Sequence, residues 1–522
     1  MNPNEKNKTG KRVIRKMLIG LAWLATIIAL FYAEEDWRGA HEWNHYRQQL
    51  EANGAQLDLA AFIPKPVPDN QNFAAIPVIE SWFTQRTNFD KKWADNYALA
   101  SSMIGSESNP PAPEGKQGGE RYFLDLVAWK MAFVAIESGR TDSNQQFASG
   151  KLDLASRASA APVVLADLAS SETELDQLRA ASDRPYARYP VIYDMDDPWG
   201  VLLPHLGNVK RTVQRLQLRT CAELAASQSD HALADVKLML YLADSVRTEP
   251  FLISYLVRLA CVHLAIQPVW EGLAEHAWSD SQLQELQARF QQYDFVTDLK
   301  RPLDSERAAG MLTIELTQKN GIHYWEDINN SSGTPAPSHH RIDKLIDSLV
   351  PRGWYDQEKL SYCRLFDLLL RSDLDSAKRQ VLPKEVESNK DKLEQALAKT
   401  KFNRAIHHQI VASVLLPALG GVPKKAAMAQ TAVDEAAIAC ALERYRLANG
   451  QFPENLGALV PKFISQLPND VIAGESYKYH RATDGQFVLY SIGWNEKDDG
   501  GVPGQTLFDD KNGDWVWQYP PK

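Results

Sequence analysis

An apolar run close to the N-terminus dominates the hydrophobic pattern of the chain. Residues 17–33 (MLIGLAWLATIIALFYA) carry no charge, and about 17–25 apolar residues suffice for a helix to cross a bilayer core. We therefore predict a transmembrane anchor over residues 17–33. A cleaved secretory signal is the alternative, but cleavage after Ala33 would put bulky Phe31 at the −3 position, where signal cleavage favours a small side chain.

The charges on either side of this run predict its orientation. Acidic Glu34, Glu35 and Asp36 follow the run, and basic residues crowd the segment before it. Positively charged flanks stay on the cytoplasmic side of a membrane. We expect a single-pass inner-membrane protein with a basic cytoplasmic tail at 1–16 and the bulk of its chain in the periplasm. The tail's basic residues are Lys6, Lys8, Lys11, Arg12, Arg15 and Lys16.

Residues 34–119 read as a juxtamembrane helix followed by linkers. An amphipathic pattern over residues 36–53 ends at Gly54, a residue type that commonly terminates helices. Its aromatic residues suit the membrane interface and a packing surface of the body equally well, so both interpretations stay open. Proline- and glycine-rich stretches predict loops, because proline fixes φ and excludes helix. These stretches cover residues 64–72, 105–119 and 328–339.

The next segment, residues 120–425, has the pattern of stacked helices. Residues 231–246 are apolar on two faces, which is typical of a helix packed on two sides. Helical periodicity also covers residues 208–226 and 251–270. We predict a helical array here. Capping-box spacing, which marks helix starts, occurs at Ser171 with Glu174 and at Ser279 with Gln282.

The last hundred residues change character. A helical pattern over residues 426–448 ends at Asn449-Gly450, and a short helix is expected over 456–460. Two short strand patterns then flank Asp484-Gly485, which predicts a hairpin with a type I′ turn. The fold class expected for the whole chain is mainly α, with a small α+β module at residues 426–522.

The order of these elements resembles the major pseudopilin of type II secretion systems. The matching stretches are ALERYRLANGQFPENLGALVP (441–461), YKYH (477–480) and FVLYSIGWNEKDDGG (487–501), and residues 410–434 look like a degraded pseudopilin helix. The resemblance covers about a fifth of the chain and implies a pseudopilin-like module. Unlike a pseudopilin, the chain carries the segment internally, with no processing site before it. The whole arrangement also looks like large envelope proteins of planctomycete and verrucomicrobial type.

Composition narrows the classes of partner. The chain has 522 residues, enough for two to four domains, and a net charge of −9. An acidic chain has no overall attraction for nucleic acid. The four cysteines lie far apart with no zinc-binding spacing, so buried free thiols are expected, although an oxidising compartment would permit a disulfide. They are Cys221, Cys261, Cys363 and Cys440.

Candidate catalytic chemistry is sparse. The chain lacks GxSxG, HExxH, Walker and GxGxxG motifs, which leaves no positive reason to predict an enzyme. Adjacent histidines point about 100° apart on a helix and make a poor metal site. Asp197-Pro198 predicts a turn rather than a calcium loop, and two acid–base pairs are expected to be surface ion pairs. The histidines are His339-His340 and His407-His408, and the pairs are Glu306-Arg307 and Glu443-Arg446.

The acidic C-terminal loop is the one candidate metal site. Calcium prefers six to eight oxygen ligands from carboxylates, amides and carbonyls. In the pseudopilins that this region resembles, the loop after the YSxG strand holds calcium, and the matching ligand positions here are Asn495 and Asp514. Asn495 keeps one oxygen ligand but carries no charge, so we expect a lower calcium affinity unless Asp498 or Asp499 compensates. A set of solvated acidic turns is the alternative.

The sequence therefore favours a membrane-anchored, non-catalytic envelope protein that mediates protein–protein contacts. A type II-like secretion accessory is one alternative, because of the resemblance. A periplasmic hydrolase with its site among residues 180–330 is the other.

Overall fold

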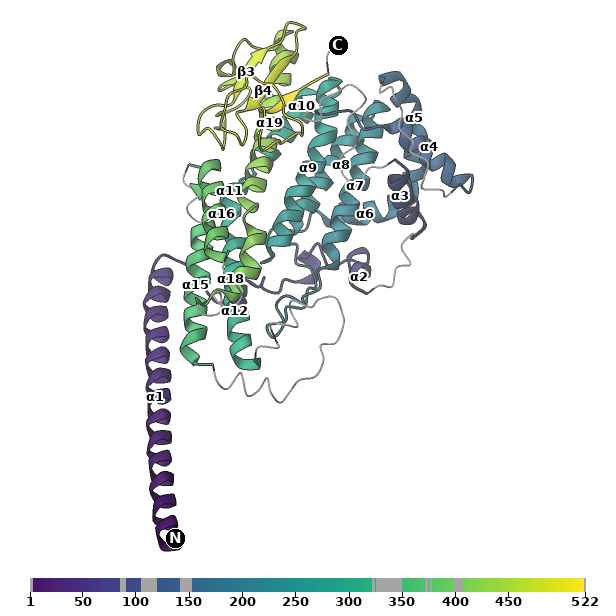
Figure 1. The fold of residues 1–522 in the computed structure, drawn as a ribbon. Coiled ribbons are helices and arrows are strands. Elements are labelled where there is room, and N and C mark those ends of the chain that lie inside the picture. The colour runs from purple at the N-terminus through teal and green to yellow at the C-terminus, as the bar shows by residue number, and fades with distance from the viewer. Residues whose placement is uncertain are drawn as a thin grey trace.

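The computed structural model of the chain consists mainly of helices (Figure 1). Helices make up 65% and strands 5% of it, which confirms the expected mainly helical class with a long apolar N-terminal helix and a small sheet near the C-terminus. The structure describes residues 3–84, 91–104, 120–140, 153–321, 324, 350–370, 374–375, 378–398 and 407–520. Two of the predicted loops, at 105–119 and 328–339, lie outside these residues.

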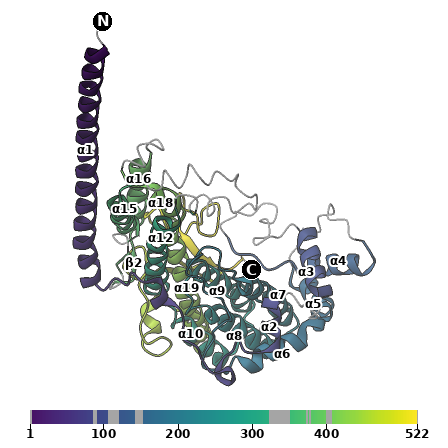
Figure 2. The ribbon, with the colours of Figure 1, turned by 90° about the horizontal axis from the view of Figure 1, so that it is seen from below.

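Helix α1 (Pro3–Ala52) is continuous. The sequence predicted two helices, at 17–33 and 36–53, but Glu34, Glu35 and Asp36 are compatible with helix and nothing interrupts it between them. Apolar side chains from Val13 to Phe31 are exposed. Figures 1 and 2 both show the N-terminal part of α1 projecting beyond the rest of the chain.

The C-terminal part of α1 packs along α15 (Arg352–Leu370). The helices approach so closely at Gly39 and Gly353 that a Cβ on Gly39 would lie 2.2 Å from the Gly353 carbonyl oxygen. Trp354 Nε1 donates to Glu35 at 2.9 Å, and Tyr46 OH donates to Asp367 at 2.9 Å. The helix that carries the apolar run is thus joined directly to the helical body.

The remaining helices form the body (Figure 1). The predicted helices at 208–226, 231–246 and 251–270 are confirmed as α7, α8 and α9, which pack against one another. The α-helices are α2 (Pro77–Thr84), α3 (Lys91–Ile104), α4 (Leu126–Glu137), α5 (Leu154–Leu168), α6 (Glu172–Ala181), α7 (Pro204–Ala225), α8 (Ser229–Ser245), α9 (Leu252–Ala274), α10 (Asp280–Phe290), α11 (Phe295–Asp298), α12 (Lys300–Asn320), α16 (Pro383–Leu397), α18 (Ile410–Leu415) and α19 (Val422–Asn449). Short 3-10 helices are η1 (Leu59–Phe62), η2 (Asp69–Gln71), η3 (Ala169–Ser171), η4 (Leu416–Leu419) and η5 (Leu456–Leu459).

The two predicted capping boxes have different outcomes. Ser279 and Gln282 form a complete capping box at the start of α10. The prediction of a capping box at Ser171 is wrong. The Ser171 hydroxyl donates to the Leu168 carbonyl instead, and α6 has no side-chain cap. Helical dihedrals at Ser171 continue the chain from η3 into α6, so the serine lacks the extended geometry that an N-cap requires.

A three-stranded antiparallel sheet follows α19, with the order β3-β4-β5. Its strands are β3 (Lys478–Arg481), β4 (Phe487–Ser491) and β5 (Trp515–Gln518). The first two form the predicted hairpin, and β5 was not predicted. A separate two-stranded sheet pairs β1 (Leu374–Asp375) with β2 (Gln380–Val381).

The predicted type I′ turn of this hairpin is wrong. A type I′ turn needs a positive φ at both central residues, but of the Asp484-Gly485 pair only Gly485 has one, at +84°. Gly485 N donates to the Ala482 carbonyl at 3.1 Å, and Ala482 N donates to Gln486 O. These bonds describe a type I turn followed by a left-handed glycine, the arrangement of a longer hairpin loop.

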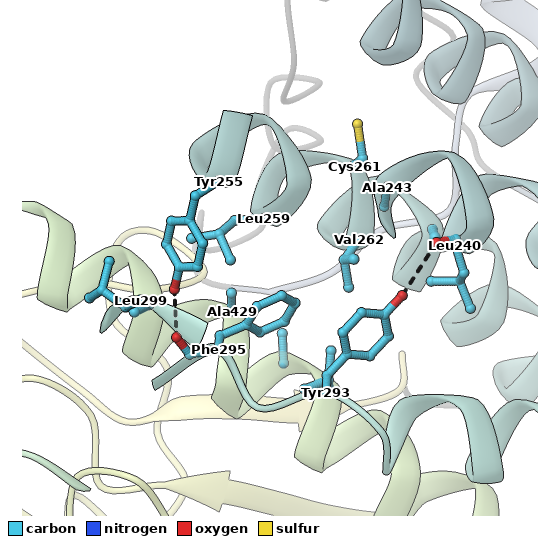
Figure 3. Close-up of a cluster of buried hydrophobic side chains, with 14 of the residues drawn as sticks. Leu240, Ala243, Tyr255, Leu259, Cys261, Val262, Tyr293, Phe295, Leu299 and Ala429 are labelled. Carbon is cyan, nitrogen blue, oxygen red and sulfur yellow. Dashed lines mark hydrogen bonds between the residues drawn. The ribbon is translucent and has the colours of Figure 1, made fainter. Parts of the chain in front are cut away.

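One large apolar core contains side chains from α1, from the body helices and from the C-terminal sheet. Figure 3 shows part of it, where Tyr255 and Tyr293 lie among aliphatic side chains. The Tyr255 hydroxyl donates to the Phe295 carbonyl at 2.7 Å, so a polar group in the core keeps a partner. All four cysteines are buried and free, as expected.

Candidate functional site

A cavity of about 1160 Å³ lies near the C-terminal end of α1. Its walls come from the end of α8, the turn before α9, the first turns of α9 and α12, and the segments around residues 54–67 and 184–188. Small-molecule sites commonly have volumes of about 300–1,000 Å³. The cavity is therefore large enough for an organic ligand rather than a single ion.

Cationic side chains outnumber anionic ones around this cavity by eight to four. This excess contrasts with the net charge of −9 for the whole chain. The lining cations are Lys65, Arg184, Arg188, Arg247, Arg258, Arg289, Lys300 and Arg301, and the anions are Asp244, Glu249, Asp298 and Asp304.

Part of the positive charge is neutralised within the wall. Buried Arg258 donates to Asp244 and to Asp298, each at 2.7 Å. Asp244 also accepts from Arg289 at 2.5 Å, and Asp298 accepts from Arg247 at 2.8 Å. Two carboxylates are thus shared among three guanidinium groups, so this network keeps a net positive charge.

Three other arginines contact backbone carbonyls instead. Arg184 Nη1 donates to the carbonyl of Asn72 at 2.9 Å, Arg188 Nε donates to that of Pro64 at 3.0 Å, and Arg301 Nη2 donates to that of Phe62 at 2.7 Å. No carboxylate lies within ion-pair distance of these groups among the described residues. Carbonyl oxygens satisfy donors without cancelling a full charge, so this side of the cavity stays cationic.

The inner wall holds a buried polar chain. Glu249 accepts from the Ser254 hydroxyl at 2.5 Å and lies 2.6 Å from His205 Nε2. The His205 ring is stacked between Tyr189 and Phe83. In a nucleophilic triad the histidine contacts the serine and takes its proton. Here Glu249 lies between His205 and Ser254, so these hydrogen bonds support the cavity wall and do not activate Ser254.

The structure brings the four predicted calcium ligands into one loop. Asp499 N donates to Asp514 at 3.2 Å, and Asn495 Nδ2 donates to Asp499 at 3.1 Å. Asp498 accepts from the Tyr490 hydroxyl at 3.1 Å. Hydrogen bonds thus link Asn495, Asp499 and Asp514 in sequence, whereas Asp498 bonds to Tyr490 of β4.

Other groups also bind these carboxylates. Gly501 N donates to Asp514 at 2.7 Å, and Lys497 forms an ion pair with Asp499. Burial raises the pKa of the Asp514 carboxyl above its ordinary value. Within the described part of the chain no three His, Cys, Asp or Glu side chains are gathered as a metal-binding group. The calcium site stays a prediction.

The remaining sequence candidates have structural roles where they are described. Asp197 Oδ1 accepts from Gly200 N at 3.1 Å, which fits the predicted turn. The ring of His408 lies 5.5 Å from that of Trp354, and burial lowers the His408 pKa. His339 and His340 lie outside the described residues.

The predicted surface ion pair Glu306-Arg307 is wrong. Arg307 is fully buried and pairs with Asp304 at 2.9 Å and Asp367 at 3.3 Å. Glu306 accepts instead from Leu252 N at 3.1 Å. Side chains of adjacent helical residues do not face each other, which explains the separate partners.

The second predicted ion pair does form, although its acid is buried. Glu443 and Arg446 pair at 2.6 Å one helical turn apart, and Glu443 is 2% exposed. Its Oε1 also lies 2.9 Å from His276 Nδ1.

The buried carboxyl of Glu358 predicts a pH-dependent stability. Burial raises its pKa from 4.5 to about 7, although N–H groups of Val411 and Ile410 favour the charged form. Between about pH 4.5 and 7 the folded chain therefore binds a proton that the unfolded chain releases, so this group's contribution to stability falls as pH rises. We expect Glu358→Gln to be more stable than the wild type at pH 8, by on the order of 2 kcal/mol, and similar to it at pH 4.5.

Urea midpoints of the full chain in detergent, at the two pH values, measure this difference. Glu454→Gln is the matched control, because the Glu454 side chain is 79% exposed and its substitution should leave both midpoints unchanged. A Glu358→Gln variant that loses stability equally at both pH values would contradict the prediction.

No family model, curated protein or solved structure matches this chain. The resemblance of its C-terminal region to the major pseudopilin therefore stays a prediction.

Sequence reasoning missed the cavity. Its cations come from distant segments and form no motif. The nearest signal is the stretch DRPYARYP (183–190), where two arginines alternate with two prolines outside the helices and strands. Such a pattern indicates an ordered loop, but the position of its arginines against α8, α9 and α12 is set by tertiary packing.

Proposed function

We propose that the protein is a single-pass, membrane-anchored envelope protein without catalytic activity, which holds its helical body outside the inner membrane for contacts with partners. One observation carries the proposal. Helix α1 runs without a break from exposed apolar side chains to its packing against α15. An uninterrupted helix transmits the position of its membrane segment to the body that it contacts.

The choice of α1 as the anchor rests on burial. Among the described residues, three helical segments are long and apolar enough to cross a membrane: Arg12–Ala52, Leu252–Ala274 and Ile410–Asn449. The apolar window of the first is 0% buried, whereas those of the others are 61% and 50% buried within the body. An exposed apolar surface of this length is unfavourable in water, whereas the other two segments supply core contacts.

The charge asymmetry supports the orientation. Basic residues precede the apolar run and acidic residues follow it, which favours a cytoplasmic N-terminus and a periplasmic body. The exposed Trp37 lies just past the run, at the level where tryptophan favours the membrane interface.

A role beside type II secretion machinery is the second candidate. It is favoured by the succession of α19, the β3–β4 hairpin and an acidic loop, the order that the resemblance implies. Crosslinking in native membranes followed by co-purification of secretion components would support this role.

The anchor predicts how the full chain behaves in membranes. We expect it to stay in the membrane fraction after a carbonate wash, and a periplasmic reporter fused to its C-terminus to be active. A Leu21→Arg/Leu24→Arg double variant should be released or fail to insert, since arginine within the apolar core is unfavourable. Leu154→Arg is the control, because Leu154 is exposed on the body. A soluble wild-type chain beginning near Glu34 would overturn the anchor.

A further inference from the structure

We propose that the cavity between α8, α9 and α12 binds a soluble polyanion, a small molecule that carries two or more phosphate or carboxylate groups. This inference goes beyond the anchoring role. It combines the charge of the cavity, its rigidity and its distance from the membrane.

The unneutralised cations lie along one side of the cavity. Lys65 is exposed and has no ion-pair partner among the described residues. Within the described part of the chain, the side chains of Arg184, Arg188 and Arg301 donate to backbone carbonyls and to no carboxylate. Guanidinium groups have five N–H donors and bind phosphate or carboxylate through paired hydrogen bonds. Several such groups around about 1160 Å³ favour a ligand with more than one charge over a single oxyanion.

The cationic side is held in place before any ligand binds. Phe73 N donates to the Tyr186 carbonyl at 2.7 Å, and Tyr186 N donates to the Gln71 carbonyl at 3.2 Å. The Asn72 side chain donates from Nδ2 to the Arg188 carbonyl at 2.9 Å and accepts from Arg188 N through Oδ1 at 2.8 Å. Two segments more than a hundred residues apart thus fix each other, and a preorganised site loses less entropy on binding.

The position of the cavity distinguishes a soluble ligand from a lipid headgroup. Helices α1 and α15 run side by side, with Gly39 beside Gly353 and Tyr46 beside Asp367. The cavity begins at Gly54, just past the end of α1. At 1.5 Å per residue, Gly54 lies about 30 Å from the end of the apolar run at Ala33. If α1 anchors the chain as proposed, this distance keeps the lipid headgroups of that membrane away from the cavity.

Calorimetric titration of the full chain, purified in a zwitterionic detergent, tests the proposal. The probes are tripolyphosphate and citrate, with anionic phosphatidylglycerol vesicles as a third arm. We expect saturable binding of tripolyphosphate, citrate or both, weakened by salt because screening reduces charge–charge attraction. Whichever binds more tightly identifies phosphate or carboxylate as the preferred group.

Matched lysine variants locate the binding. Lys65→Glu reverses a charge at the rim and should raise Kd about tenfold, by the Coulomb energy of two charges at contact distances near a surface. Arg301→Gln should weaken binding in the same direction. Lys425→Glu makes the same charge change at an exposed lysine of α19 and should leave Kd unchanged. Unchanged melting temperatures show that the variants are folded.

Three outcomes overturn the proposal: no binding of either soluble probe, equal effects of Lys65→Glu and Lys425→Glu, or binding to the vesicles alone. Because the titration uses detergent-solubilised chain, a negative result leaves the membrane anchor standing. If the carbonate-wash test fails, the argument from distance against lipid headgroups no longer holds. The titration with phosphatidylglycerol vesicles then decides whether the cavity binds a lipid headgroup.

Discussion

Replacing Arg157 with methionine is expected to lower the free energy of unfolding by about 3–5 kcal/mol. Arg157 extends from α5 into the protein interior, where it forms ion pairs with Glu271 of α9 and with Glu275, the residue just after α9. Its guanidinium also lies 4.6 Å from the centre of the Phe123 ring. The Arg157 and Glu271 side chains are 1% and 0% exposed. Methionine fills the space but leaves a buried carboxylate without its counter-charge.

A double variant separates the cost of the unpaired charge from loss of packing. Glu271 also accepts from Leu124 N at 2.6 Å, and glutamine keeps an acceptor there without a charge. Adding Glu271→Gln to Arg157→Met should therefore recover part of the lost stability. Urea unfolding of the full chain in detergent, followed by tryptophan fluorescence, measures both variants.

Arg481→Met provides the control for this experiment. Arg481 also pairs with a glutamate, Glu454, but that side chain is 79% exposed. Exposed pairs contribute about 0–1 kcal/mol, so the urea midpoint should hardly move. Equal midpoint shifts for Arg157→Met and Arg481→Met would show that the buried pair is not the source of the effect.

Local patterns predicted the elements whose contacts are close in sequence. The apolar periodicity at 208–226 and 231–246 became α7 and α8, because periodicity depends on residues three and four apart. Asp484-Gly485 located the β3–β4 hairpin for the same reason. Its turn type was wrong because Asp484 keeps a negative φ, which the dipeptide alone does not decide.

Elements that depend on distant partners were missed. Strand β5 is only four residues long and pairs with β4 across the acidic loop, with Trp515 opposite Ser491. No short turn links the two strands, so no local signal gives their pairing. The burial of Arg307 had the same cause, since one of its partners, Asp367, lies on another helix.

The candidate site was the least predictable part of the molecule. Arg188 and Arg301 line one cavity although 113 positions separate them in the sequence. The local sequence around each arginine predicts only a polar loop or the surface of a helix. A charge excess of this kind is a property of folded surfaces, and the acidic composition of the chain conceals it.

The crossing of α1 and α15 gives a second test with a large expected effect. Gly39→Ala in α1 should destabilise the full chain by about 1–3 kcal/mol, a typical cost of overpacking. A Cβ there would lie 2.2 Å from the carbonyl oxygen of Gly353, which is backbone and cannot move aside like a flexible side chain. Helix propensity acts in the opposite direction, because alanine favours helix over glycine by about 1 kcal/mol.

The sign of the change therefore decides which effect dominates at this contact. Gly20→Ala, in the apolar part of the same helix, has nothing within 4 Å of its new Cβ and should show the propensity effect alone. Gly353→Ala should destabilise like Gly39→Ala, and the two effects should not add, because either one separates the helices. Thermal melting in detergent gives the stability, and protease cleavage after Ala33 reports separation of α1 from the body. If Gly39→Ala stabilises the chain as Gly20→Ala does, α1 does not pack closely against α15, and the anchor is not rigidly joined to the body.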